Sequence, residues 1–506
     1  MTGCPISHHG VSKASVGCSH LAASHFSKLF PGLPPVSLTE EQAAIIGGPG
    51  GLMHDFDGTS NDSSIPCGYI FFAQFVDHDI TLDVTSSLRV QQASDEAIAK
   101  LPNIRTPSLD LDCVYGFGPE ASPHIYDGSR PGRIAIHPNG HDLARSPSGS
   151  ALIGDPRNDE NIFVGQMQLL FHRFHNKLFN ERVYQEAGSE PFSRFEEAQK
   201  QARYHYQWIV LFDFLKRLCD PAVFRFAAGK LIAGNTEFPF FHKTDSHGKL
   251  GMPVEFSVAA YRVGHTMVRS SYAVNADELD VELFAQEFGT EGFSELPSDL
   301  VADWRYLLEV DECIRPRMAK AIDTLLANEI QDMPRLVVNS NNPNDRALAF
   351  RNLLRGSSLR LPSGQAVAAQ LAAKGYPVNP NIDLALDDLS GWNRLDRLEE
   401  NNVSPLRTAT PLFYYILRES EVNNQGERLG PVGSAILMEV FGAMLSCSQH
   451  SFLKAPGEWN PDPCVSKERW GWWGDKYQEG FSRESLINNE DYYPFELADV
   501  VRFVLA

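Results

Sequence analysis

The stretch that says most about this protein is Phe72-Ala73-Gln74-Phe75-Val76-Asp77-His78-Asp79. Its apolar positions predict a short helix, and on a helix Gln74, Asp77 and His78 lie at i, i+3 and i+4 and share one face. Burying three such groups without partners would cost roughly 1–3 kcal/mol each. A histidine satisfied inside an ordinary core would explain the pattern. A polar site on a buried helix would explain it equally well.

A second informative segment, Asp155-Pro156-Arg157-Asn158-Asp159-Glu160, precedes a long amphipathic helix that the apolar spacing predicts over about 164–178. Asn158 or Asp159 suits the N-cap of that helix. Arg157 and Glu160 could pair with each other at the helix start, or they could bring a cation and a carboxylate to a site.

The third segment is Ala260-Tyr261-Arg262-Val263-Gly264-His265. Apolar residues at 256, 260, 263 and 267 form one stripe, with more apolar positions elsewhere around the turn, so we expect a buried helix. Gly264 has no side chain, which would let a flat cofactor approach beside His265. A lone histidine in such a helix is also a common packing residue.

The composition limits the class of protein. The chain has 506 residues, with 43% hydrophobic and 21% charged residues, which is typical of a globular protein. Its formal charge of −20 argues against nucleic-acid binding and against attachment to anionic lipid. Helical periodicity dominates and alternating strand patterns are scarce, so we expect a mainly α protein.

The sequence also carries signals about compartment. It has no run of about 20 apolar residues that could form a transmembrane segment. The first thirty residues lack a basic leader followed by an apolar run. Eight cysteines without a C-x-x-C motif suit reduced thiols. We therefore expect a cytoplasmic protein, or one exported without an ordinary signal peptide. Nothing indicates the oligomeric state.

Together the three segments resemble the peroxidase–cyclooxygenase superfamily of haem proteins, which includes the animal peroxidases. The Gln-x-x-Asp-His-Asp, Arg-x-x-Glu and Arg-x-Gly-His runs are similar to its distal-histidine, catalytic-arginine and proximal-ligand motifs, in the family's order. Further matches lie at 352–355 and 426–433. The resemblance implies a single large helical haem-peroxidase domain over 67–455, with an irregular arm at 1–66 and a packed extension at 456–506.

The resemblance implies a role for each central residue. His265 would ligate the haem iron, and Asn352 would accept its other ring N–H. His78 would be the acid–base that moves the proton of hydrogen peroxide. Arg157 would stabilise charge as the O–O bond breaks, and Gln74 would hold water or an anion. Peroxide would be reduced through an oxoferryl intermediate, which then oxidises a small electron donor.

The same resemblance implies how haem b would be held. Asp77 and Glu160 match the two carboxylates that form ester bonds to haem methyl groups. Asn161 stands where some family members have a methionine that forms a third, sulfonium link, so we expect that link to be absent. Arg262 and Arg355 match residues that meet the haem propionates.

A calcium site is expected beside the distal helix, because the loop 106–112 has oxygen-bearing residues at every second position. A solvated acidic turn is the alternative. The predicted ligands are Asp79, Thr106, Ser108, Asp110 and Asp112.

The expected activity is therefore reduction of hydrogen peroxide with oxidation of a halide, thiocyanate or a phenol. One alternative is a fatty-acid oxygenase of the cyclooxygenase or α-dioxygenase type. Those enzymes use a tyrosine three residues before the proximal histidine, where this chain has Arg262; Tyr261 lies about 100° further round a helix. Another alternative is a non-catalytic haem- or calcium-binding protein, which would require a broken site.

Overall fold

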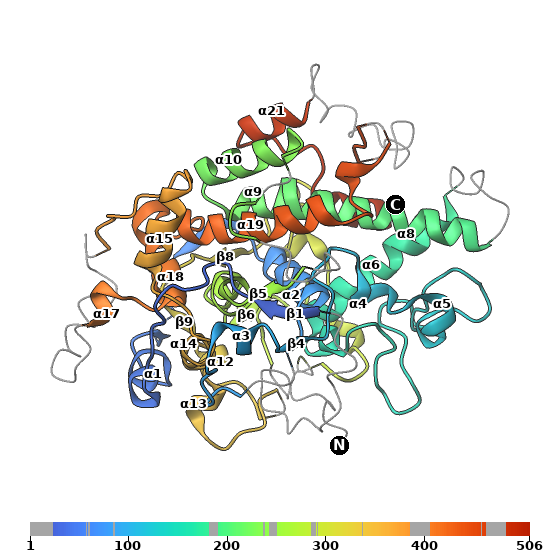
Figure 1. The fold of residues 1–506 in the computed structure, drawn as a ribbon. Coiled ribbons are helices and arrows are strands. Elements are labelled where there is room, and N and C mark those ends of the chain that lie inside the picture. Colours follow the sequence, from blue (N-terminus) through green and yellow to red (C-terminus); the bar gives the residue numbers. More distant parts are fainter. Residues whose placement is uncertain are drawn as a thin grey trace.

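The computed structural model of the chain describes residues 24–56, 58, 61–83, 87–181, 191–235, 238–241, 250–284, 290, 292–335, 337–384, 405–456, 458–461 and 482–505. The described part is mainly helical, which confirms the predicted class (Figure 1). The longest described strand, β3 (Asp62–Pro66), has five residues. None of the described helices combines the length and the apolar character that crossing a membrane would require.

The short helix that the sequence predicted is confirmed as α2 (Gly68–Ile80), the distal helix, which lies near the centre of the molecule (Figure 1). It packs against α6 (Ile162–Asn180), the long helix expected over about 164–178. Phe75 of α2 stacks on Phe171 of α6, with ring centroids 4.7 Å apart. Because α2 is buried on nearly every face, its polar residues must find partners inside the protein.

The proximal segment differs from the single buried helix that the apolar stripe predicted. A short helix, α11 (Val254–Val258), ends at Ala259, whose φ of −125° and ψ of −73° break the helical path. A tighter 3₁₀ helix, η5 (Ala260–His265), follows. A 3₁₀ helix has three residues per turn, so Arg262 and His265 lie on the same side. The expectation of one continuous α-helix was wrong here.

Two further helices enclose the centre. The helix α14 (Leu348–Ser358) packs against α11 and α18 (Leu412–Asn424), and α19 (Pro431–Cys447) packs against η5. The short 3₁₀ helix η3 (Pro156–Asp159) contacts both α2 and α6. Asn161, and not Asn158 or Asp159, caps α6, because its side chain accepts from the Val164 N–H.

The N-terminal segment is more regular than the irregular arm that the sequence predicted over 1–66. Residues 24–66 contain β1 (Ser24–Ser27), α1 (Glu40–Gly47), β2 (His54–Asp55) and β3. β1 pairs with β4 (Pro102–Asn103) and with β5 (Met252–Pro253). These residues wrap onto the helical centre, and residues 1–23 lie outside the described part. The division of the chain at 66 and 455 stays a prediction.

The C-terminal segment also packs onto the helical centre. It contains α21 (Arg483–Asn488) and α22 (Leu497–Leu505), and α22 lies against α6. The remaining helices are α3 (Asp95–Ile98), α4 (Asp112–Tyr115), α5 (Gly118–Ala121), α8 (Pro191–Ile209), α9 (Leu215–Leu218), α10 (Pro221–Ile232), α12 (Asn328–Gln331), α13 (Pro343–Arg346), α15 (Gly364–Ala373) and α17 (Pro405–Thr408). The remaining strands are β6 (Ser271–Tyr272), β7 (Val281–Glu282), β8 (Met318–Lys320) and β9 (Leu326–Ala327).

Candidate active site

A large cavity lies between α2, η3, η5 and α14. Its empty space, including the open mouth, is about 1590 Å³. The structure brings all the residues predicted for catalysis and for haem to its walls. They are Gln74, Asp77, His78, Arg157, Glu160, Arg262, His265, Asn352 and Arg355.

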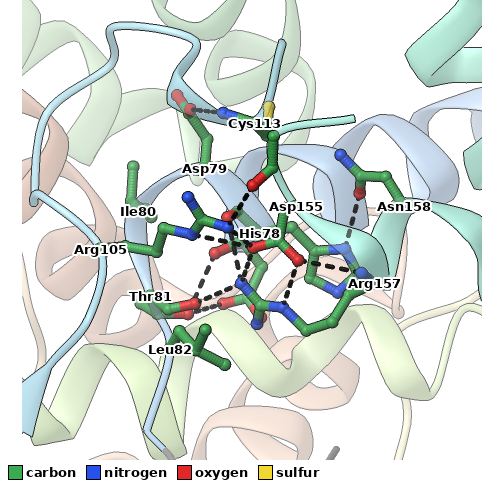
Figure 2. Close-up of polar contacts among 12 residues, drawn as sticks. His78, Asp79, Ile80, Thr81, Leu82, Arg105, Cys113, Asp155, Arg157 and Asn158 are labelled. Carbon is green, nitrogen blue, oxygen red and sulfur yellow. Dashed lines mark hydrogen bonds and ion pairs between the residues drawn. The ribbon is translucent and has the colours of Figure 1, made fainter. Parts of the chain in front are cut away.

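His78 faces the cavity from α2 as a neutral imidazole. Its Nδ1 lies 2.7 Å from Oδ1 of Asn158 (Figure 2). Among the described residues its Nε2 has no hydrogen-bond partner. Burial lowers the pKa of His78 to about 3, and the Arg157 cation acts in the same direction. A neutral ring with one nitrogen turned to a cavity can accept a proton there.

Arg157 is held beside His78 by several fixed contacts. Its Nη2 donates to the carbonyl oxygens of His78 (3.0 Å) and Thr81 (2.7 Å). Its Nε and Nη2 both donate to the Asp155 carboxylate, at 3.0 and 2.8 Å. Arg105 donates to the same carboxylate, at 2.8 Å (Figure 2). Arg157 therefore pairs with Asp155 and not with Glu160.

Arg157, Arg105 and Asp155 stabilise one another's charged forms. Burial alone would lower the pKa of Arg157, but the Asp155 carboxylate outweighs it and raises that pKa. Burial would raise the pKa of Asp155, but Arg157 and Arg105 hold it well below its usual range. Nη1 of Arg157 has no hydrogen-bond partner among the described residues and remains for a ligand. The sequence reading missed Asp155, although its place two residues before Arg157 was a usable signal.

Glu160 presents one satisfied and one unsatisfied oxygen. Its Oε1 accepts from Nε2 of Gln74. Its Oε2 is buried and has no hydrogen-bond partner in the described part of the chain. Burial raises the pKa of Glu160 to about 7, against the lowering effect of Arg157. Such an orphaned carboxyl oxygen has the chemistry to form an ester, which would remove its charge.

Asp77, the second carboxylate on the cavity wall, is better satisfied. It accepts from Oγ1 of Thr81 at 2.9 Å and forms an ion pair with Arg262 at 3.4 Å. Burial would raise the pKa of Asp77, but Arg262 and His78 lower it overall. Arg262 and Asp77 both line the cavity.

His265 lies on the opposite wall, on η5. Nδ2 of Asn352 lies 2.9 Å from its Nδ1, so the predicted pair of residues is in contact. A half-turn of the amide would place Oδ1 there to accept the ring N–H and would leave the Nε2 lone pair for a metal. Burial lowers the pKa of His265 to about 3, and Arg262 adds to this effect. A Cβ at Gly264 would meet nothing within 4 Å, so the space beside the ring is open.

A cluster of cations lies at the α14 side of the cavity: Arg262, Arg351 and Arg355. Arg355 pairs with Asp83, but its buried Nη1 has no hydrogen-bond partner among the residues that the structure describes. Nη1 of Arg351 donates to the carbonyl oxygen of Asp345 at 2.9 Å. Burial lowers the pKa of Arg351 to about 10; Asp345 opposes this effect, and the neighbouring arginines add to it. The sequence reading missed Arg351, which lies four residues before Arg355 on the same helix face.

These observations fit a haem. Its flat ring would enter the open space beside His265, and its two propionates would meet the arginine cluster, where a buried nitrogen lacks a partner. The orphaned Glu160 oxygen lies on the wall of the same cavity.

The predicted calcium loop does lie against the distal helix. Asp79 accepts from the backbone N–H groups of Leu111 (3.1 Å) and Cys113 (3.3 Å), and from the hydroxyl of Tyr206 (3.2 Å). Burial and then the neighbouring Asp112 raise the pKa of Asp79 to about 7.

The fit of this loop to a cation is partial. Burial, Asp112 and Asp79 raise the pKa of Asp110 well above its usual value. Its Oδ1 is buried and finds no hydrogen-bond partner within the described ranges. Ser108 bonds to Asp110, and the carbonyl oxygen of Thr106 accepts from the Ser108 N–H at 2.8 Å. Yet across the described ranges no three His, Cys, Asp or Glu side chains are gathered to hold a metal ion.

Comparisons with known proteins address the fold and the family. The fold is similar to peroxidase A from Dictyostelium discoideum, with a TM-score of 0.60 and 15% identity over 86% of this chain and 89% of that chain. It is also similar to the fatty acid α-dioxygenase of Oryza sativa, with a TM-score of 0.57 and 15% identity over 85% and 76% of the two chains. For the fatty acid α-dioxygenase of Arabidopsis thaliana the TM-score is 0.57, with 14% identity over 95% and 78%.

At these identities the structural matches establish the fold alone. No curated protein sequence matches the chain significantly. The sequence model of the animal haem peroxidase family matches residues 84–363, more than half of the chain. The chain therefore belongs to the animal haem peroxidase family.

Proposed function

We propose that this protein is a haem peroxidase, which reduces hydrogen peroxide and oxidises a small donor such as a halide, thiocyanate or a phenol. One observation carries the proposal. A neutral His78 and the cation of Arg157 face the same cavity as His265, with the polar groups behind them already satisfied. An acid–base and a fixed cation are the two groups that breaking an O–O bond requires.

Each residue of the distal wall then has a defined task. The haem supplies the redox chemistry when bound. Nε2 of His78 takes the proton of the bound peroxide and returns it to the departing oxygen. Arg157 stabilises the charge that develops on that oxygen, at little reorganisation cost because Asp155 already holds it. Gln74, on the same wall, orients water or an anion next to the reacting oxygens.

Other residues would hold the cofactor. His265 would ligate the iron, oriented by Asn352, and the arginine cluster would neutralise the propionates. Glu160 and Asp77 would form the two haem esters. Calcium would be held by Asp79, Asp110 and Asp112 with oxygens of Thr106 and Ser108, and it would brace the loop against α2.

The α-dioxygenase alternative depends on a tyrosine beside the proximal histidine. On η5 the residue one 3₁₀ turn before His265 is Arg262, and Tyr261 lies to one side. The Tyr261 hydroxyl donates to the carbonyl oxygen of Ala73 at 3.2 Å, and its ring stacks on Phe256. This placement favours a packing role for Tyr261.

The test is to assay the haem-loaded protein in two ways. Oxidation of guaiacol and of bromide is followed with hydrogen peroxide, and oxygen uptake is followed with linoleate. We expect peroxide-driven turnover that Tyr261→Phe leaves unchanged. Oxygen uptake that requires Tyr261, without peroxide-driven turnover, would overturn the proposal.

A further inference from the structure

The contact between His78 and Asn158 is the first link of a longer buried chain. Nδ2 of Asn158 donates to Oε1 of Gln168 at 2.7 Å. Nε2 of Gln168 lies 3.0 Å from the carbonyl oxygen of Cys113 and 2.7 Å from Nε2 of His172. We name Asn158 and Gln168 the amide relay. It runs from the distal histidine, across η3 and α6, to the backbone of α4.

The Cys113 carbonyl determines the direction of every bond in this chain, because a carbonyl oxygen can only accept. It accepts from Gly154 N–H and from Gln168, both at 3.0 Å. Gln168 must therefore turn its NH₂ group to Cys113 and its oxygen to Asn158. Asn158 must in turn place its NH₂ group on that oxygen and its own oxygen on His78.

The second hydrogen of the Gln168 NH₂ group is consistent with the same orientation of this amide. It is left for Nε2 of His172, which then accepts. Asn158, Gln168 and His172 are each 0% exposed, so bulk water has no access to rotate or replace a link. Reversing either amide would place two hydrogen donors or two oxygens face to face at a buried position.

We propose that the Cys113 carbonyl, acting through the amide relay, fixes His78 in the tautomer with hydrogen on Nδ1. Nε2 then carries the lone pair that faces the cavity. Asn158 and Gln168 are positioning residues: they act on the reaction through His78 and do not touch the substrate. The assignment of the tautomer rests on geometry alone, while its effect on peroxide rests on the function proposed above.

The tautomer decides whether His78 can act as a base. With hydrogen on Nε2, the ring would present a donor to the incoming peroxide and could not take its proton. Partners behind a catalytic or metal-bound group typically change affinity or activity by about 10–100-fold. We expect a loss in that range for the peroxide reaction when the relay is cut.

The tautomer itself is measured by NMR on full-length protein labelled with ¹⁵N-histidine. The protein is prepared without haem and also with zinc protoporphyrin, a diamagnetic analogue, and the His78 signals are assigned by their loss in His78→Gln. We expect a protonated Nδ1 and an unprotonated Nε2 in both forms. A protonated Nε2 in the unsubstituted protein would overturn the proposal, whether or not the protein reacts with peroxide.

The link through Gln168 is tested with a matched pair of substitutions. Gln168→Met cuts the relay. Gln166→Met makes the same chemical change two residues earlier on α6, where Gln166 donates to the carbonyl oxygen of His141 instead. We expect only Gln168→Met to give a mixture of His78 tautomers and a 10–100-fold slower peroxide reaction. Reduction of the already oxidised enzyme by its donor should be unchanged in both variants.

Asn158 supplies a second test of the relay. Asn158→Leu removes the oxygen that faces Nδ1 of His78 and the NH₂ group that donates to Gln168. We expect this variant to lose the Nδ1–H tautomer and most of the peroxide reaction rate. If Gln168→Met and Asn158→Leu leave the tautomer and the rate unchanged, the relay has no positioning role. If the tautomer responds and no peroxide reaction exists in any form, the proposed function fails and the relay stands.

Discussion

The distal and proximal walls of the cavity differ in how their polar groups are satisfied. On the distal wall, Arg157 and His78 are held by carbonyl oxygens, by Asp155 and by Asn158. On the proximal wall, Arg355 keeps a buried nitrogen that has no partner among the described residues, and the side chain of His265 contacts that of Asn352. A wall whose acid–base and cation are held in place before any ligand arrives is preorganised for reaction. A wall with an unsatisfied cationic nitrogen is prepared to bind an anionic cofactor.

Removing the distal cation should give the largest effect. In Arg157→Leu we expect the second-order rate of reaction with peroxide to fall by about 10²–10³-fold, because one preorganised electrostatic contact is lost. Haem content should be unchanged. Stopped-flow absorbance with pseudo-first-order peroxide measures the rate. The rate of Arg157→Lys should lie between those of the unsubstituted protein and Arg157→Leu, since lysine keeps the charge but cannot form two hydrogen bonds to Asp155. Equal rates in all three proteins would contradict a preorganised distal wall.

The unsatisfied oxygen of Glu160 should appear as a pH-dependent loss of stability in the haem-free protein. Its folded pKa of about 7 lies above the ordinary value of 4.5, so stability falls as pH rises from about 4.5 to 7. At pH 8 we expect Glu160→Gln to be more stable than the unsubstituted protein by about 3 kcal/mol. Urea unfolding at pH 4 and pH 8 measures the difference.

Asp77 is the matched control for Glu160, because folding shifts its pKa in the opposite direction. Its pKa is lowered on folding, so its carboxylate stabilises the protein above its ordinary pKa, and this contribution is lost as pH falls. Asp77→Asn should therefore be less stable than the unsubstituted protein at pH 8. A stability difference for Glu160→Gln that is the same at pH 4 and pH 8 would show that burial of its charge is not the cause.

On the proximal wall, the Asn352 contact should matter less than the distal cation. Asn352→Leu removes the group that orients His265, and outer partners of metal ligands typically contribute about 10–100-fold. We expect a haem affinity lower by that factor, measured by titration of the Soret band. The peroxide reaction per bound haem should change less than in Arg157→Leu. A larger loss of the peroxide reaction in Asn352→Leu than in Arg157→Leu would contradict the assignment of reaction to the distal wall and of cofactor binding to the proximal wall.

Arg351 should contribute a smaller share of haem binding. A charge-assisted hydrogen bond is worth about 1.5–3 kcal/mol. Because Arg262 and Arg355 remain, we expect Arg351→Leu to lie at the lower end of this range, with haem binding roughly 10-fold weaker. The haem-free protein should not lose stability, because other arginines repel this buried cation. Haem titration and thermal unfolding of the same samples check both expectations. A large loss of stability without haem would assign Arg351 a packing role.

Calcium should have the smallest effect on either wall, because its loop contacts α2 through Asp79, which does not line the cavity. Adding calcium to chelator-treated protein should raise the melting temperature by about 1 °C for each 1 kcal/mol of binding energy in a chain of this length. Asp110→Asn should abolish this shift. No shift in the unsubstituted protein would mean that Asp79 holds the loop through its backbone hydrogen bonds alone.

The residues that meet in the cavity could be predicted because each carries its own chemistry in a recognisable spacing. Their partners were not predictable in the same way. Asp155, Gln168 and Arg351 have ordinary roles in isolation, and their importance depends on which segments the fold brings together. The break at Ala259 was missed because an apolar stripe of period 3.6 does not reveal a backbone that tightens to three residues per turn.

The proposal that His78 is the acid–base of a peroxide reaction is tested most directly by stopped-flow mixing with hydrogen peroxide. Haem-loaded protein is compared with its His78→Gln variant. Equal haem content is confirmed beforehand. We expect the Soret band of the unsubstituted protein to change at least about 100-fold faster than that of the variant, because an acid–base catalyst contributes about 10²–10⁴-fold. Equal rates in the two proteins, or a Soret response to linoleate and oxygen but none to peroxide, would contradict it.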